Sequence, residues 1–160
     1  MMIIWIILII LFVPFGLIVL IGAPFVPSKT KNIQKILDGV KIRKGSLLLD
    51  LGSGDGRVLA EFARRGYKVV GYELNPILAL VSKLRLRKYP LTNVHSSDYW
   101  RADVSKADVI FVFSATPFMA RLYDKLKNEL KPGAMVISYG FSFEGIKIDR
   151  KVSVANIYQF

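Results

Sequence analysis

A hydrophobic run that leads into three glycines limits the fold of this chain more than any other feature. Residues 47–51 read Leu-Leu-Leu-Asp-Leu, and residues 52–56 read Gly-Ser-Gly-Asp-Gly. A short apolar run of this kind is typical of a strand buried on both faces of a parallel sheet. Glycines at alternate positions after such a strand let the backbone lie close to a ligand. The stretch therefore predicts a ligand-binding loop at the end of a buried strand.

Strand and helix patterns alternate through the rest of the chain. Alternation at this spacing predicts right-handed βαβ units in an α/β fold, with a doubly wound, mostly parallel sheet and helices on both faces. The tail, residues 147–160, has two short β-type runs that predict a terminal hairpin or an edge strand. The expected helices are 32–39, 56–65, 76–87 and 119–130, and the expected strands are 46–51, 68–72, 93–96, 108–114 and 134–139.

The first 28 residues contain no charged side chain. Residues 3–22 are almost uniformly apolar, and about 20 residues at roughly 1.5 Å each span a hydrocarbon core of about 30 Å. The sequence therefore predicts one transmembrane helix ahead of the α/β domain, kinked near Pro14. A cleaved signal peptide is the alternative, but no basic residue precedes the apolar run and Pro24 directly follows the only small-residue cleavage point.

These features divide the chain into two parts. Residues 1–28 are expected to form the transmembrane anchor and an extended linker, and residues 29–160 one domain of ordinary size. Basic residues follow the predicted span and none precede it. The positive-inside rule therefore places a single-pass protein in the membrane with its domain on the cytoplasmic side.

The net charge of +11 fits two kinds of polyanion. Nucleic acid is one, but a domain tethered beside a bilayer gains roughly 1 kcal/mol for each Lys or Arg near anionic lipid headgroups. We therefore expect a membrane partner rather than nucleic acid. The densest basic patch, residues 83–88, fits a lipid-facing surface and a solvated helix face equally well. The chain has no cysteine, so thiolate metal sites and cysteine nucleophiles are excluded, and no metal is expected.

Asp50 indicates which ligand the glycine loop holds. A carboxylate near the two phosphates of a dinucleotide costs electrostatic energy in a partly buried site. Arg57 also stands where the dinucleotide pattern G-x-G-x-x-G requires a glycine. A ligand with positive charge and no phosphate fits better, and S-adenosylmethionine, with its ammonium and sulfonium groups, is such a ligand.

Two further acids stand at the predicted ends of strands. Glu73 follows Gly56 by 17 positions, which suits a carboxylate that accepts both ribose hydroxyls. Asp98 is expected to accept a hydrogen bond from the adenine amine, with Tyr99 or Trp100 beside the ring, although Asp98 alone also fits a turn or helix cap. The predicted cofactor-binding residues are Asp50, Gly52, Ser53, Gly54, Gly56, Glu73, Asp98 and Tyr99.

Residues 50–56, together with Glu73 and Asp98, resemble the motifs of class I S-adenosylmethionine-dependent methyltransferases. Residues 24–28, 50–57 and 71–76 look more narrowly like the small membrane-anchored protein-lysine methyltransferases, which include enzymes that act on the ATP synthase c-subunit and on the adenine nucleotide translocase. The resemblance covers about residues 24–139 and implies a Rossmann-like methyltransferase fold. It places Asp50 and the glycines at the methionine end, Glu73 at the ribose and Asp98 at the adenine. After the fifth strand this chain is short, so the number of strands stays open.

The end of the fourth predicted strand is expected to face the methyl acceptor. Nucleobase-amine methyltransferases carry Asn/Asp-Pro-Pro-aromatic there, whereas residues 114–118 read Ser-Ala-Thr-Pro-Phe, which counts against a nucleobase acceptor. Thr116, Pro117 and Phe118 are expected to line the acceptor mouth. Phe118, Tyr139 and Phe141 are candidates for aromatic walls, although each also fits a core position. The single histidine, His95, lies in a predicted strand and is interpreted as structural.

Together these observations favour a methyltransferase that modifies a lysine at the membrane edge of a membrane protein. No residue stands out as a catalytic base. Two other functions remain open: methylation of a lipid, quinone or other small membrane-soluble molecule, and a membrane-tethered module that binds S-adenosylmethionine without catalysis.

Overall fold

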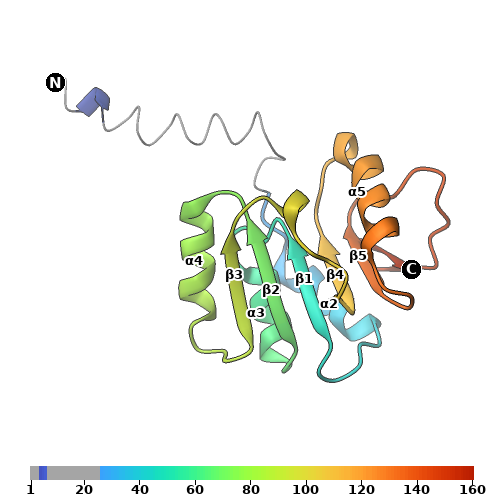
Figure 1. Cartoon of the computed structure of the whole chain (residues 1–160). Coiled ribbons are helices and arrows are strands. Elements are labelled where there is room, and N and C mark those ends of the chain that lie inside the picture. The colour runs from blue at the N-terminus through green and yellow to red at the C-terminus, as the bar shows by residue number, and fades with distance from the viewer. Residues whose placement is uncertain (1–3, 7–25) are drawn as a thin grey trace.

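The computed structural model describes residues 4–6 and 26–160, and residues 26–160 form one α/β unit (Figure 1). Its centre is a seven-stranded sheet in the order β3-β2-β1-β4-β5-β7-β6. The first five strands run parallel, and β7 is antiparallel to both β5 and β6. The strands are β1 (Leu47–Leu51), β2 (Lys68–Glu73), β3 (Thr92–Ser96), β4 (Val109–Val112), β5 (Met135–Tyr139), β6 (Arg150–Val152) and β7 (Ala155–Gln159).

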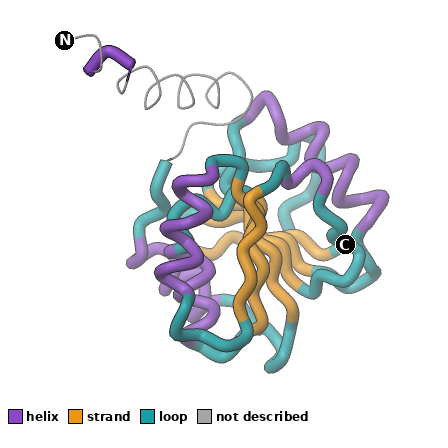
Figure 2. The backbone as a smooth tube through the Cα atoms, turned by 60° about the vertical axis from the view of Figure 1, so that its left-hand side comes forward, coloured by secondary structure: helices purple, strands orange, loops and turns teal. Residues whose placement is uncertain are grey.

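Helices cover both faces of the sheet, as the turned view shows (Figure 2). Three of them share the hydrophobic core on one face: α2 (Thr30–Gly39), α3 (Arg57–Arg64) and α4 (Pro76–Leu86). One long helix, α5 (Thr116–Glu129), packs on the other face. The two cores divide along β1, where Leu48 packs with α2, α3 and α4 while Leu49 and Leu51 pack with α5. This division follows from the alternation of side chains along a strand.

The face that carries α5 has less helical cover than the other. The connection from β3 to β4 contains a single 3-10 turn, η1 (Tyr99–Arg101). Residues 140–149, between β5 and β6, form no helix but contribute Phe143 to the core. The Phe143 N–H donates to the hydroxyl of Tyr158 on β7 (3.1 Å), so a loop fixed to the sheet takes the place of a helix.

Most predicted elements are confirmed, with differences at one strand end, at one helix start and in the tail. Strand β4 ends at Val112 rather than at residue 114. Helix α5 begins at Thr116 rather than Met119, because Pro117 occupies its first turn, where a missing N–H has no helical partner to lose. The tail forms the predicted hairpin, but β7 lies inside the sheet beside β5 and only β6 is at the edge. The sheet thus has seven strands, the number that the sequence left open.

The predicted transmembrane helix falls mainly on residues outside the described part of the chain. Residues 4–6 form a turn of helix, and residues 1–3 and 7–25 are not described. Within the described residues, no helix combines the length and apolar character needed to cross a bilayer. The anchor therefore stays a prediction.

Candidate cofactor and acceptor site

The glycine loop connects β1 to α3 at the carboxyl edge of the parallel strands, the upper edge of the sheet in Figure 1. Gly52, Gly54 and Gly56 have φ angles of +93°, +54° and +76°, a region that other residues rarely adopt. The N–H groups of Gly52 and Ser53 both donate to the carbonyl of Tyr72, at 2.9 and 3.0 Å. The loop is therefore fixed to the end of β2, and its glycines are required by the backbone itself.

Glu73 holds the loop from the end of β2. Its Oε2 accepts the N–H of Gly54 (2.7 Å), and its Oε1 accepts the N–H of Asn75 (2.8 Å). The side chain is buried. Each carboxylate oxygen has a second lone pair, so these bonds leave capacity for the ribose hydroxyls that the sequence predicts there. The predicted role stays a prediction, and the loop-fixing role is an addition to it.

Asp50 is the most buried acid of the site, with 2% of its surface exposed. Its Oδ2 has no hydrogen-bond partner among the described residues. Burial raises the pKa of Asp50 well above its ordinary value, and the nearby charges of Glu73 and Asp55 raise it further. A buried carboxylate without a partner costs folding free energy, which a cationic ligand would offset.

Ser53 is also buried, and its hydroxyl lies over Gly71 of β2. A Cβ at Gly71 would stand 2.7 Å from Oγ of Ser53 and 2.5 Å from Leu59, so the missing side chain makes room for the loop. Oγ of Ser53 has no partner among the described residues. Ser53 thus lies in the loop as predicted, with a free hydroxyl next to the strand.

Asp55, Arg57 and Arg85 connect the glycine loop to α4 and to the linker. The sequence analysis did not predict this group. Asp55 accepts bonds from Nε of Arg57 (3.0 Å) and Nη2 of Arg85 on α4 (2.8 Å). Arg57 also donates to the carbonyl of Ser28 (3.3 Å), which brings the linker to the loop. Burial opposes ionisation of Asp55, but the hydrogen bond from Arg57 and the charge of Arg85 outweigh it and lower the pKa.

Asp98 follows β3 and begins the 3-10 turn. Its Oδ1 accepts the N–H of Trp100 (3.0 Å), so it is the turn cap that the sequence offered as the alternative. The rings of Tyr99 and Trp100 lie 4.8 Å apart, and the guanidinium of Arg121 on α5 stacks on Trp100 at 4.1 Å. Burial is the main cause of a raised pKa at Tyr99. Asp98 and Tyr99 therefore lie at the carboxyl edge, and their contact with adenine stays a prediction.

The residues predicted to line the acceptor mouth fall in the first turn of α5. Thr116 and Pro117 are exposed there and Phe118 is half-buried. Next to them, the hydroxyl of Ser114 is buried and lies close to the hydroxyl of Tyr99, whose pKa it lowers in opposition to burial. These four residues follow β4 directly, so they lie at the same edge of the sheet as the glycine loop.

An aromatic cluster follows the ends of β4 and β5. The ring of Phe113 lies 4.8 Å from that of Tyr139 and 6.0 Å from that of Phe141. Tyr139 is buried, and its hydroxyl accepts a bond from Asn32 of α2 (3.1 Å). Sequence reasoning named Tyr139 and Phe141 but assigned Phe113 to the strand interior. Among the described ring contacts, none joins Phe118 to this cluster. His95 is exposed on β3, with its ring stacked on that of Tyr72 at 5.1 Å.

The geometry of the loop fits S-adenosylmethionine. The partnerless Oδ2 of Asp50 matches the ammonium of the methionine part, and no phosphate has to be placed beside it. A Cβ added at Gly52 would meet no atom within 4 Å, so open space lies over the backbone there. No group of three or more His, Asp or Glu side chains suited to a metal occurs among the described residues.

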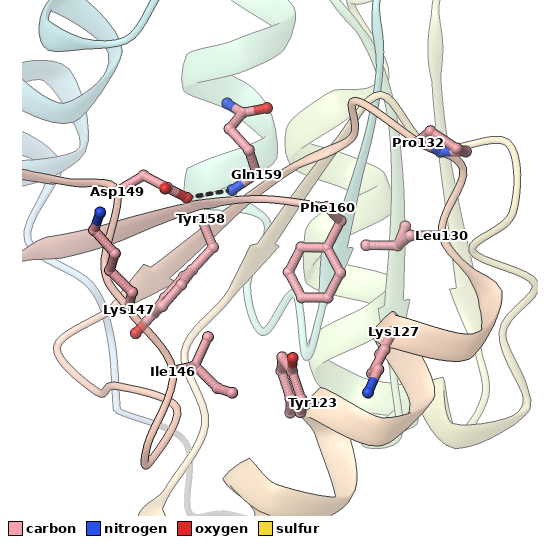
Figure 3. A pocket seen from close by; sticks show the side chains of 10 residues that line it. All are labelled: Tyr123, Lys127, Leu130, Pro132, Ile146, Lys147, Asp149, Tyr158, Gln159 and Phe160. Carbon is pink, nitrogen blue, oxygen red and sulfur yellow. Dashed lines mark hydrogen bonds between the residues drawn. The ribbon is translucent and has the colours of Figure 1, made fainter.

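A pocket of about 440 Å³ lies elsewhere, between α5, β7 and residues 146–149 (Figure 3). Tyr123, Leu130 and Phe160 line it together with charged Lys127 and Asp149. None of the predicted site residues borders this pocket. The left-handed glycines and the buried acid lie instead at the glycine loop.

The fold and the loop define a class I S-adenosylmethionine-dependent methyltransferase. The profile described as ANTKMT methyltransferase domain matches residues 50–150, and the chain belongs to this family. An RNA methyltransferase from Salinibacter ruber, solved with S-adenosyl-L-homocysteine, is similar in structure, with a TM-score of 0.77 and 27% identity. The superposition covers 84% of this chain and 92% of that one.

Proteins of similar sequence support the assignment to this family. The human ATP synthase c-subunit lysine N-methyltransferase is 37% identical over 123 residues, which cover 75% of this chain and 52% of the relative. A protein-lysine N-methyltransferase of Saccharolobus islandicus is 31% identical, with 76% of this chain and 79% of the relative covered. Mouse adenine nucleotide translocase lysine N-methyltransferase is 32% identical, with 74% and 53% covered. The chain spans about half the length of the two mammalian relatives.

Proposed function

We propose that this protein transfers a methyl group from S-adenosylmethionine to the side-chain amine of a lysine in a membrane protein. The observation that carries the proposal is the buried, partnerless carboxylate of Asp50 beside the glycine loop. It lies in a fold whose relatives include named protein-lysine N-methyltransferases. When bound, the cofactor supplies an electrophilic methyl group on a sulfonium.

In this proposal, each residue around the loop contacts a different part of the cofactor. Asp50 pairs with the ammonium, Glu73 receives the ribose hydroxyls, and the glycines keep side chains away from the ligand. Asp98 and Tyr99 complete the adenine end. Asp55, with Arg57 and Arg85, holds the loop in the binding conformation before the ligand arrives. Preorganisation of this kind lowers the cost of ordering the site.

The aromatic cluster at the ends of β4 and β5 suits a lysine amine, which must lose its proton before it can accept a methyl group. A lysine with a pKa near 10.4 is mostly protonated at neutral pH, and its deprotonation costs roughly 4 to 5 kcal/mol. Passage beside Phe113, Tyr139 and Phe141 would favour the neutral amine, because apolar surroundings disfavour the charged form. Positioning then provides much of the catalysis, since methyl transfer needs the nucleophile in line with the sulfur-to-methyl bond.

The membrane part of the proposal rests on the uncharged N-terminal segment. Ser28, the last residue of this segment, accepts a hydrogen bond from Arg57 at the carboxyl edge of the sheet. A membrane anchor leading into that edge would hold the site near the bilayer on the cytoplasmic side and raise the effective concentration of acceptors there. Two relatives are named for membrane-protein acceptors, the ATP synthase c-subunit and the adenine nucleotide translocase.

Incubation of isolated membranes with a radiolabelled methyl donor tests the proposal. Membranes that contain the full chain should incorporate label into protein, and mass spectrometry should place it on lysine. The Glu73→Ala variant should incorporate none, because it loses a ligand contact and leaves the N–H groups of Gly54 and Asn75 unpaired. Glu144→Gln, a change in an exposed loop, is the matched control and should match the parent chain.

Three results would contradict this function. Label in lipid extracts and not in protein would indicate a lipid or quinone acceptor. Label in RNA would indicate the acceptor class named for the Salinibacter relative. No label that depends on the full chain, combined with calorimetric binding of S-adenosylmethionine, would identify a module without catalysis.

A further inference from the structure

Helix α4 presents hydrophobic side chains to solvent along its outer face. Leu80 and Leu84 are each 57% exposed, and Ile77 is 50% exposed. Of the eight large hydrophobic side chains exposed from residue 26 onward, six lie between residues 74 and 91. We call the side chains of Leu74, Ile77, Leu80, Val81 and Leu84 the α4 apolar face.

In an ordinary amphipathic helix the large hydrophobic residues are buried, whereas in α4 several of them are exposed. Ala79, Ser82 and Leu86 face the sheet, at the spacing of one helix side. The α4 apolar face lies opposite them, where a solvated helix carries polar residues. Figure 1 shows α4 at the outer edge of the molecule, next to the edge strand β3. A contiguous apolar surface of this kind marks an interaction site.

The charges that the segment of the α4 apolar face itself carries have one sign. Residues 74–91 contain no Asp or Glu, and exposed Lys83, Arg87 and Lys88 flank or end the face. A hollow of about 410 Å³ lies beside it, lined by Lys83 and Arg87 together with Thr92 and Asn93. Two cations and two polar side chains around one hollow suit an anionic headgroup.

We propose that α4 lies on the surface of an anionic lipid bilayer, with the α4 apolar face at the boundary between headgroups and acyl chains. Basic flanks around an apolar stripe are the features that hold a helix in the plane of a membrane interface. A second copy of this chain is a poorer partner, because two faces without acidic residues would repel each other.

The contact has a consequence for the orientation of the site. Asn75 caps α4 and donates its N–H to Glu73, which also accepts the N–H of Gly54, so one carboxylate connects the start of α4 to the glycine loop. A helix held at the bilayer would therefore fix the height of the loop relative to the headgroups. Binding of α4 to the bilayer does not depend on methyl transfer.

A spin label on α4 of the full chain tests the proposal, and the absence of native cysteine makes the labelling specific. The label is placed at Leu84→Cys, with Asn128→Cys on the exposed side of α5 as the matched control. In vesicles that contain phosphatidylserine, the label at 84 should lie about 5–10 Å below the phosphates. There it should meet dissolved oxygen more often, and a water-soluble nickel complex less often, than the label at 128.

The charges are tested by reversal in the same labelled chain. Lys83→Glu with Arg87→Glu should return the label at 84 to water, and so should vesicles of phosphatidylcholine alone. Equal depth in both kinds of vesicle would overturn the role of the basic residues. Access of the nickel complex equal to that at 128 would overturn the contact. Protection from both reagents would show that protein covers the helix, either a second copy or the chain's own N-terminal segment.

Discussion

Asp50, near the end of β1, and Asp55, in the glycine loop, have opposite electrostatic situations. Asp50 is buried without a partner for its Oδ2, and burial raises its pKa well above the ordinary value of 3.8. Because the folded state then binds a proton more tightly than the unfolded chain, stability falls as the pH rises above 3.8 toward the folded-state pKa. A cationic ligand beside Asp50 would favour the charged carboxylate and so lower its pKa again. Binding of such a ligand should therefore offset the stability lost through burial of the charge.

The Asp50→Asn variant separates these effects. Without a ligand the variant should melt at a higher temperature at neutral pH, by about 2–4 °C for each kcal/mol of removed charge burial. Its affinity for S-adenosylhomocysteine should fall about 10- to 100-fold, because a charge-assisted bond to the ammonium is lost. Thermal melting and calorimetric titration measure both quantities.

The Glu144→Gln variant should change neither quantity. Equal affinity of the Asp50→Asn variant and the parent chain would contradict the assignment of Asp50 to the ammonium.

The sequence predicts Asp50 and Glu73 as cofactor-binding residues, because each lies within or at the end of an apolar run that indicates a strand. It does not predict the pairing of Asp55 with Arg85, since the two residues are 30 positions apart and lie in separate elements. Phe113 was missed for a different reason. The expected strand extended to residue 114, whereas β4 ends at Val112 and Phe113 already belongs to the site edge.

At the scale of elements, α3 and α4 meet at a glycine. A Cβ on Gly56 would stand 2.2 Å from Oγ of Ser82, which lies in the buried face of α4. Gly56 also has a φ of +76°, so a side chain there is strained in addition to the contact. The start of α3 therefore depends on a residue with no side chain.

The Gly56→Ala variant should lose more stability than a glycine change that adds strain alone. Gly66→Ala is the matched comparison, because Gly66 has a φ of +82° and no atom within 4 Å of an added Cβ. The left-handed conformation should cost each variant roughly 1–3 kcal/mol. Overpacking against Ser82 should cost Gly56→Ala a further 1–3 kcal/mol or so. Urea unfolding measures the difference.

The Ser82→Ala change should restore part of the stability of Gly56→Ala, since it removes the closest atom but leaves the Ser82 Cβ at 2.9 Å. Equal losses for Gly56→Ala and Gly66→Ala would show that α3 moves away from α4 at no cost.

Element types were predictable where the hydrophobic pattern was clear, as in the apolar run of β1 and the periodic apolar faces of α2 and α3. The start of α5 was placed three residues late, although Thr-Pro at residues 116–117 is a recognisable helix start. The insertion of β7 between β5 and β6 was not predictable from the local pattern, because β7 pairs with β5, and β6 lies between the two in the sequence. Pairing partners depend on the whole sheet, which local periodicity does not encode.

At the scale of the whole molecule, the ion pairs of Asp55 connect the linker, the loop and α4. Arg57 joins the carboxylate to Ser28, and Arg85 joins it to the helix that carries the apolar face. Three segments far apart in the sequence therefore share one buried acid, and protonation of that acid weakens all of these contacts together. The acid stability of the fold should reflect this.

The pH dependence of unfolding tests the connection. The pKa of Asp55 is lowered from 3.8 in the folded protein, so the unfolded chain binds the proton more tightly. Its contribution is complete above pH 3.8 or so and is lost as the pH falls through the folded-state pKa. Urea unfolding of Asp55→Asn below about pH 5 should have a shallower slope against pH, by at most about 1.4 kcal/mol per unit. Asp124→Asn, an exposed change on α5, should keep the slope of the parent chain, and an unchanged slope for Asp55→Asn would show that the cluster does not stabilise the fold.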